Sequence, residues 1–165
     1  MSAAVPSSTL ASPERVAALH EVEVEVGVLI RRVRRVIGER ARAVHPSLLP
    51  ASYLILSHVR ERGPLRASAL SLVFEIDKGA ISRQVQHLID LGLLAREPDP
   101  EDGRATLLSV TPAAARRLDE VSRERSALLA ERLGDWPADD ISMLAGSLRR
   151  YNRALEDDGD RDPRC

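Results

Sequence analysis

The chain has 165 residues, of which 44% are hydrophobic, 30% are charged and 2% are aromatic. This balance excludes a disordered chain and predicts one domain, or one module with an oligomerisation element, around an aliphatic core. The formal net charge of −1 gives no general attraction to a polyanion, so any such contact must rest on a local charge pattern.

Several protein classes are excluded by simple inspection. The single cysteine, Cys165, is the last residue, so a disulfide framework and CxxC metal sites are ruled out. The N-terminal stretch MSAAVPSSTLASPE has neither the basic nor the apolar region of a signal peptide. No window approaches the ~18 apolar residues of a membrane span. We therefore expect a cytoplasmic protein with no membrane association, no metal and no cofactor.

Polar and small residues at both ends predict flexible tails over residues 1–12 and 157–165. After the first tail, HEVEVEVGVLI alternates in polarity as a strand does, but a longer pattern competes with it. Apolar residues recur at spacings of three and four through the Arg-rich segment that follows, which favours one long helix ending before Pro46. The members of this repeat are Leu19, Val22, Val26, Leu29, Val33 and Val36.

Two shorter helices are predicted next. The first covers 50–62 and is stopped by Gly63-Pro64, after which Leu65 and Arg66 suit a very short strand. The second covers 68–74, and Glu75-Ile76 forms a tight link to the next helix. The residues expected to face inward are Leu54, Ile55, His58 and Val59 in the first helix, and Leu70, Val73 and Phe74 in the second.

Asp77 is a good N-cap for a further helix, which ends at Leu91-Gly92. Two apolar runs, 93–97 and 106–110, flank PDPEDGRA and predict a β-hairpin with a long tip. Thr111-Pro112 is a cap and first-turn pair for a helix to about Gly134, and Pro137 starts a last helix. That last helix keeps an apolar repeat at Ile141, Leu144, Leu148, Tyr151 and Leu155.

The predicted order is therefore α-α-β-α-α-β-β-α-α, mainly helical with a small β-hairpin. Two short helices joined by a tight turn and followed by a hairpin are the pattern of a winged helix-turn-helix. We expect this module over 48–111, flanked by helical regions at 13–47 and 112–156. The apolar repeats of the flanking helices exceed what one small core needs, which favours an isologous homodimer built from both chain ends over packing within the monomer.

The helix that Asp77 caps, which is the second of the two helices joined by the tight turn, separates an apolar side from a polar side. Ile81, Val85 and Leu88 cluster on one side, together with Ile89, and short or forked polar groups fall opposite. Such a polar side suits the major groove of DNA, although a solvated helix face has the same composition. Arg83 could pair with guanine and Gln86 with adenine, while Ser82 and His87 could contact base edges or phosphate. The first turn suits a phosphate, through Lys78, the only lysine, and Gly79, which allows close approach.

The tip of the hairpin carries acidic residues followed by Gly103 and Arg104. The spacing of Asp102 and Arg104 lets the carboxylate orient the guanidinium, which could then enter the minor groove, where the negative potential is deepest. An exposed tip with a weak local ion pair is the simpler alternative.

The run GLLAREPDPEDGRATLLSVTPAA, preceded by IDKGAISRQVQHLIDL, resembles the MarR family of bacterial transcription regulators over about residues 15–155. The resemblance implies that 78–87 form the recognition helix, that Arg104 is the minor-groove arginine oriented by Asp102, and that Arg96 braces the wing. It places the flanking helices in a dimerisation region. Three residues depart from the family pattern, one of them Trp136, which occupies a position often held by a capping Ser. Glu75 stands where glycine is common, and Arg66 where a capping Ser or Thr is common, so that Ser68 would cap one turn later.

The resemblance also implies a function. We expect a repressor that binds a palindromic operator on double-stranded DNA as a homodimer and is released by a small aromatic or anionic effector. The candidates for lining an effector site are Tyr53, His58 and His45, each of which also suits ordinary packing.

Three alternatives remain open. An enzyme is disfavoured because no nucleophile, phosphate-binding or zinc motif is present. A winged-helix module for protein–protein contact would lose the polar helix side or gain an apolar patch. A pH-responsive regulator could use His87, whose charge would act directly on DNA affinity.

Overall fold

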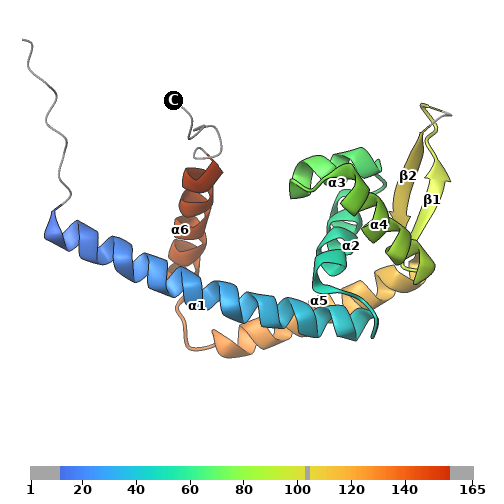
Figure 1. Ribbon diagram of the computed structural model, residues 1–165. Coiled ribbons are helices and arrows are strands. Elements are labelled where there is room, and N and C mark those ends of the chain that lie inside the picture. Colours follow the sequence, from blue (N-terminus) through green and yellow to red (C-terminus); the bar gives the residue numbers. More distant parts are fainter. Residues whose placement is uncertain (1–11, 103–104, 157–165) are drawn as a thin grey trace, which may run out of the picture. The chain divides into compact units, whose positions relative to one another are not determined.

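The computed structural model describes residues 12–102 and 105–156. Within them the order is α1 (Pro13–Val44), α2 (Pro50–Arg62), α3 (Ala67–Phe74), α4 (Lys78–Asp90), β1 (Leu94–Pro98), β2 (Thr106–Val110), α5 (Pro112–Arg132) and α6 (Ala138–Glu156) (Figure 1). The prediction of a mainly helical fold with one small hairpin is confirmed. The chain divides after Val121 into two compact units, and α5 runs from the first into the second.

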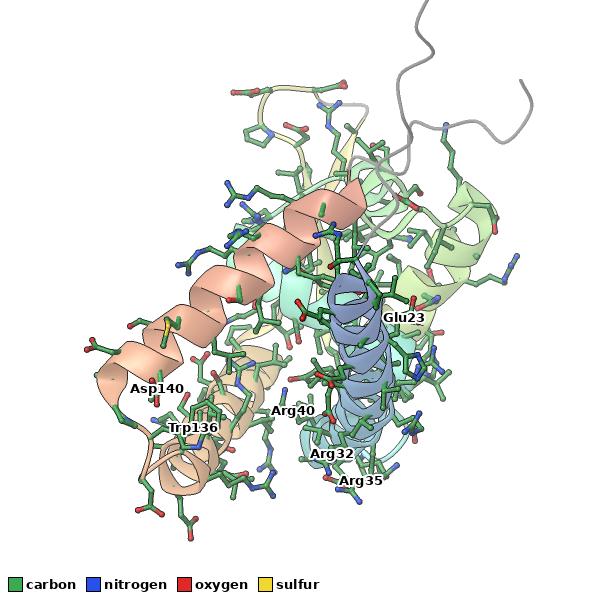
Figure 2. All side chains as sticks on the ribbon, turned by 90° about the vertical axis from the view of Figure 1, so that its left-hand side faces the viewer. Glu23, Arg32, Arg35, Arg40, Trp136 and Asp140 are labelled. Atoms are coloured by element: carbon green, nitrogen blue, oxygen red, sulfur yellow. The ribbon has the colours of Figure 1, made fainter. Side chains whose placement is uncertain are left out.

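Helix α1 is continuous over 32 residues, so the spacing of three and four prevailed over the strand-like alternation. Ser12, the last residue of the predicted N-terminal tail, is its N-cap, and the Ser12 hydroxyl accepts a hydrogen bond from the Arg15 amide at 3.3 Å. Only the last part of the helix, at Gly38, Ala41 and Val44, is buried. Charged side chains project from the rest of the helix surface, among them the labelled Glu23, Arg32, Arg35 and Arg40 (Figure 2).

The core of the first unit is aliphatic, as the composition requires. It draws on the end of α1, on α2, α3, α4 and the hairpin, and on the start of α5. Its most deeply buried members include Ile55, Leu56, Leu70, Ile81, Val85, Leu88 and Leu108.

Two residues expected to face this core do not. Leu54 is 41% exposed, because the buried positions of α2 follow one another as Ser52, Ile55, Leu56 and Val59, and residue 54 lies on the other side of that turn. Val73 is 53% exposed, since Leu70 and Phe74, one turn apart, supply the inner side of α3.

The helices begin and end where local signals predict, with one exception. Asp77 accepts from the Ala80 amide at 2.9 Å, and Thr111 accepts from the Ala114 amide at 3.3 Å. Ser68 does not cap α3. The N-cap position belongs to Arg66, whose side chain makes no capping hydrogen bond.

The hairpin pairs β1 and β2 antiparallel, from Leu94 opposite Val110 to Pro98 opposite Thr106. Leu65 adds a single bridge to β2. Its amide donates to the Leu108 carbonyl at 3.2 Å, and the Leu108 amide donates to the Leu65 carbonyl at 2.8 Å. The predicted short strand is this bridge, which ties the start of α3 to the hairpin.

In the second unit, α6 keeps its apolar repeat on an exposed surface: Ile141, Leu144, Leu148 and Leu155 are all exposed. No helix in the described parts of the chain has an apolar stretch long enough to cross a membrane.

Candidate nucleic-acid interface

Helix α4 is held in one orientation by its apolar side. Ile81, Val85 and Leu88 are almost fully buried, and they recur at spacings of three and four. Because a helix with one buried stripe cannot rotate without exposing it, the residues on the opposite side are fixed toward solvent. The hairpin contacts the same helix through β1 (Figure 1).

The polar side predicted from the sequence is on the surface. Lys78, Gly79, Ser82, Arg83 and Gln86 are exposed, and His87 is half-buried. None of these six residues is packed into the core, so they form a continuous polar ridge over the first three turns of α4, here called the α4 ridge.

Two ridge residues are oriented by neighbours. The side-chain nitrogen Nε2 of Gln86 donates to an Asp90 carboxylate oxygen at 2.8 Å, which leaves the side-chain oxygen Oε1 of Gln86 to accept elsewhere. The His87 Nε2 atom lies 3.4 Å from the Ser47 carbonyl, and the Ser47 amide donates to His45 Nδ1 at 3.1 Å. His87 is therefore linked through one loop residue to His45.

Gly79 has a steric role at the start of the ridge. A Cβ atom there would stand 3.1 Å from the Asp77 carboxylate and 3.5 Å from an Arg83 guanidinium nitrogen. The glycine therefore leaves room for the Asp77 carboxylate, which caps α4. The missing side chain also lets another molecule approach the α4 backbone closely.

The wing is the hairpin of β1 and β2 together with its tip. Beyond the two strands it continues as a hydrogen-bonded loop. The Asp99 amide donates to the Ala105 carbonyl at 3.1 Å, and the Ala105 amide donates to the Asp102 carbonyl at 2.8 Å. Arg104, with its expected pairing to Asp102, lies outside the described residues. Arg96 is exposed on β1 opposite Leu108, and its expected bracing of the wing stays a prediction.

A cluster that the sequence did not predict joins the wing to α3. Arg66 Nε and Nη2 donate to the same Asp99 carboxylate oxygen, at 2.9 and 2.6 Å, and Nη2 lies 3.4 Å from an Asp102 oxygen. The other Asp99 oxygen accepts from the Glu101 amide at 2.9 Å. We call Arg66, Asp99 and Asp102 the wing anchor.

The electrostatics of the wing anchor favour the charged forms. The Glu101 amide, and after it the Arg66 guanidinium, lower the pKa of Asp99 below the usual range of a carboxyl group. The hydrogen bond to Asp99 likewise raises the pKa of Arg66. Asp99 is only 8% exposed, so its charge needs these donors.

From the sequence alone, Arg66 stands out only as a poor helix cap. Its partner Asp99 lies 33 residues away, and no local spacing connects the two. The sequence offered one signal for this ion pair: an unsuitable cap residue at the start of one helix, together with unexplained acidic residues in the hairpin tip.

The residues proposed for an effector site have structural neighbours. The His58 ring packs edge-on against Phe74, with ring centroids 5.6 Å apart and planes at 78°. His45 accepts from Ser47, as described above, and Tyr53 is half-buried against the core. Within the described residues, no group of three or more His, Cys, Asp or Glu side chains is arranged to hold a metal ion.

Helices α3 and α4, joined at Glu75 and followed by the hairpin, define a winged helix-turn-helix, a DNA-binding class of transcription regulators. The MarR family model matches residues 47–105. The HTH-type transcriptional regulator YxaD of Bacillus subtilis is 30% identical, over 82% of this chain and 94% of that protein.

Solved structures agree on the fold. A crystal structure of a MarR family transcription regulator superposes with a TM-score of 0.75 at 16% identity, covering 90% of this chain and 97% of the other. The apo form of MarR from E. coli gives a TM-score of 0.61 at 21% identity, covering 78% and 95%. The chain belongs to the MarR family of transcriptional regulators. Both YxaD and the MarR family protein of the first superposition are named as regulators of transcription.

Proposed function

We propose that the chain is a repressor that binds a palindromic operator as a homodimer, with the α4 ridge in the major groove and the wing beside it. The exposure of the α4 ridge on a helix whose other side is buried is the observation that carries this proposal. A helix presenting short polar and forked donor groups is what the major groove admits.

The ridge divides into base-contacting and phosphate-contacting residues. Arg83 donates to guanine O6 and N7, and Gln86 pairs with adenine after exchanging its contact with Asp90. Ser82 and His87 contact base edges or phosphate. Lys78 and the amides of the first turn, with Gly79, hold a phosphate. Arg104, oriented by Asp102, enters the minor groove, and Arg96 braces the wing.

Dimerisation supplies the second half-site. The apolar repeat of α1 leaves Leu19, Val22, Leu29 and Val33 exposed in the single chain, and the repeat of α6 is exposed as well. Unpartnered apolar stripes of this length are typical of oligomer interfaces. We propose that residues 13–47 and 112–156 form the dimer region and that 48–111 form the DNA-binding domain.

In this proposal, repression follows from occupancy, because a dimer seated over the operator blocks polymerase. A small aromatic or anionic effector would change the separation of the two ridges and lower the affinity. Tyr53, His58 and His45 remain the proposed lining residues.

A gel shift tests the DNA-binding part of the proposal. The full chain is mixed with the duplex upstream of its own gene, with a random duplex as competitor, at moderate salt. A specific shift that survives the competitor supports the proposal. Equal affinity for both duplexes contradicts it, because phosphate contacts alone carry no sequence information.

A protein-binding role is the second candidate, because α3 exposes an apolar pair. Leu72 is 82% exposed and Val73 lies next to it. If this pair binds a protein partner, Leu72→Ser abolishes that binding and leaves the operator shift intact. If the pair serves DNA binding alone, no partner is lost when Leu72 is replaced.

A further inference from the structure

The wing anchor fixes the base of the wing tip at a second point. The backbone bridge between Leu65 and Leu108 holds the middle of β2, and the Arg66 side chain then reaches Asp99, directly after the end of β1. A two-stranded hairpin is only marginally stable by itself in water, so side-chain contacts outside it decide how well its tip is held.

Asp99 is well suited to this task. Both of its carboxylate oxygens are engaged, one by two Arg66 nitrogens and the other by the Glu101 amide. Hydrogen bonds between an ionised donor and an ionised acceptor are shorter and stronger than neutral ones, and the contact at 2.6 Å is among the shortest between described residues.

The same contacts account for acidic side chains in a loop expected to approach DNA. A carboxylate beside the phosphate backbone is repelled, so Asp99 and Asp102 carry an electrostatic cost in DNA binding. Both contact Arg66, at 2.6 and 3.4 Å, which offsets part of their charge and uses it to hold the loop.

We propose that Arg66 and Asp99 are positioning residues for DNA binding. They fix the position of the wing relative to the helix-turn-helix and do not contact DNA themselves. This inference rests on the proposed function. It predicts that removing the Asp99 charge weakens DNA binding, although simple electrostatics predicts the opposite.

The first test compares Asp99→Asn with Glu101→Gln, which removes the same charge from the same loop. The probe is the duplex that the wild-type protein enriches from a random-sequence library, and affinity is measured by fluorescence anisotropy at fixed salt. We expect Asp99→Asn to bind about tenfold more weakly, as for the loss of one charge-assisted contact. Glu101→Gln should bind equally or more tightly. Binding by Asp99→Asn as tight as wild type overturns the proposal.

The second test keeps the charge of residue 66 and changes its geometry. Arg66→Lys cannot donate through two nitrogens to one oxygen, so we expect it to weaken binding to a similar extent. The matched control is Arg60→Lys, because Arg60 also makes two hydrogen bonds to one carboxylate, Asp119, at 3.1 Å each, between α2 and α5. Equal weakening by Arg60→Lys would indicate a general loss of stability and would contradict the proposal.

A readout without DNA separates this inference from the proposed function. Hydrogen exchange at the Glu101 and Ala105 amides should accelerate in Asp99→Asn and Arg66→Lys and stay unchanged in Arg60→Lys. Arg83→Ala serves as the reference for the proposed function. If Arg83→Ala weakens binding while both anchor variants bind as wild type, only the present inference fails. If Arg83→Ala also binds as wild type, the proposed function fails.

Discussion

Arg83 stands on the exposed side of α4, two residues after the buried Ile81. A change at Arg83 therefore leaves the core intact. We predict that Arg83→Ala weakens binding to the selected duplex by about 1–3 kcal/mol, the usual range for a bidentate base contact. Titration by fluorescence anisotropy measures this, with Arg116→Ala, an exposed arginine on α5, as control.

The lowered pKa of Asp99 predicts a stability that depends on pH. Because its folded-state pKa lies below the ordinary value of ~3.9, its contribution is complete above that value and is lost as the pH falls through the folded pKa. We predict that wild type and Asp99→Asn differ in free energy of unfolding by a constant amount from neutral pH down to about pH 5. The difference should then shrink in acid. Urea denaturation over a pH series measures it, and a difference that grows in acid would contradict the assignment.

Glu75, at the end of α3, determines the geometry of the helix-turn-helix link. Its backbone is left-handed, with φ 52° and ψ 36°, and the amides of Glu75 and Ile76 both donate to the Ser71 carbonyl. The family resemblance placed glycine at this position in other members, and the structure shows why it is favoured there.

We predict that Glu75→Gly stabilises the protein by about 1 kcal/mol, because it relieves the left-handed strain of a side chain. The urea midpoint measures this change. Gly92→Ala is the converse control, since Gly92 has φ 68° and its substitution should destabilise. A lower midpoint for Glu75→Gly would show that the Glu75 side chain makes a compensating contact.

The elements of the chain differ in how far local sequence determined them. Capping residues such as Asp77 and Thr111, and the stop at Gly63-Pro64, act within one turn, so the helix limits followed from the sequence. The residues that face the core in the short helices were harder to predict from the sequence. Helix α3 has too few turns for periodicity to separate Val73 from Phe74. The sequence marked Arg66 as a poor cap and the hairpin tip as unexpectedly acidic, but it could not pair Arg66 with Asp99, because that contact depends on how the hairpin docks.

The exposed apolar stripes bear on how the whole molecule assembles. Leu148 lies on the exposed repeat of α6 and is absent from the core of the first unit. We predict that Leu148→Glu yields a monomer that loses about 100-fold or more in affinity for a palindromic duplex, because the second half-site no longer adds avidity. Sedimentation equilibrium measures the mass. Leu72→Glu, on an exposed leucine of α3, should remain dimeric, and a dimeric Leu148→Glu would contradict the assigned interface.

Methylation interference on the selected duplex tests most directly whether two α4 ridges enter the major groove of one operator. Methylation of guanine N7 places a group in the major groove, where Arg83 is proposed to bind. We predict two clusters of interfering guanines on one face of the duplex, separated by about one helical turn, or ~34–36 Å. Interference that is absent, or confined to the minor-groove side of adenines, would contradict the account.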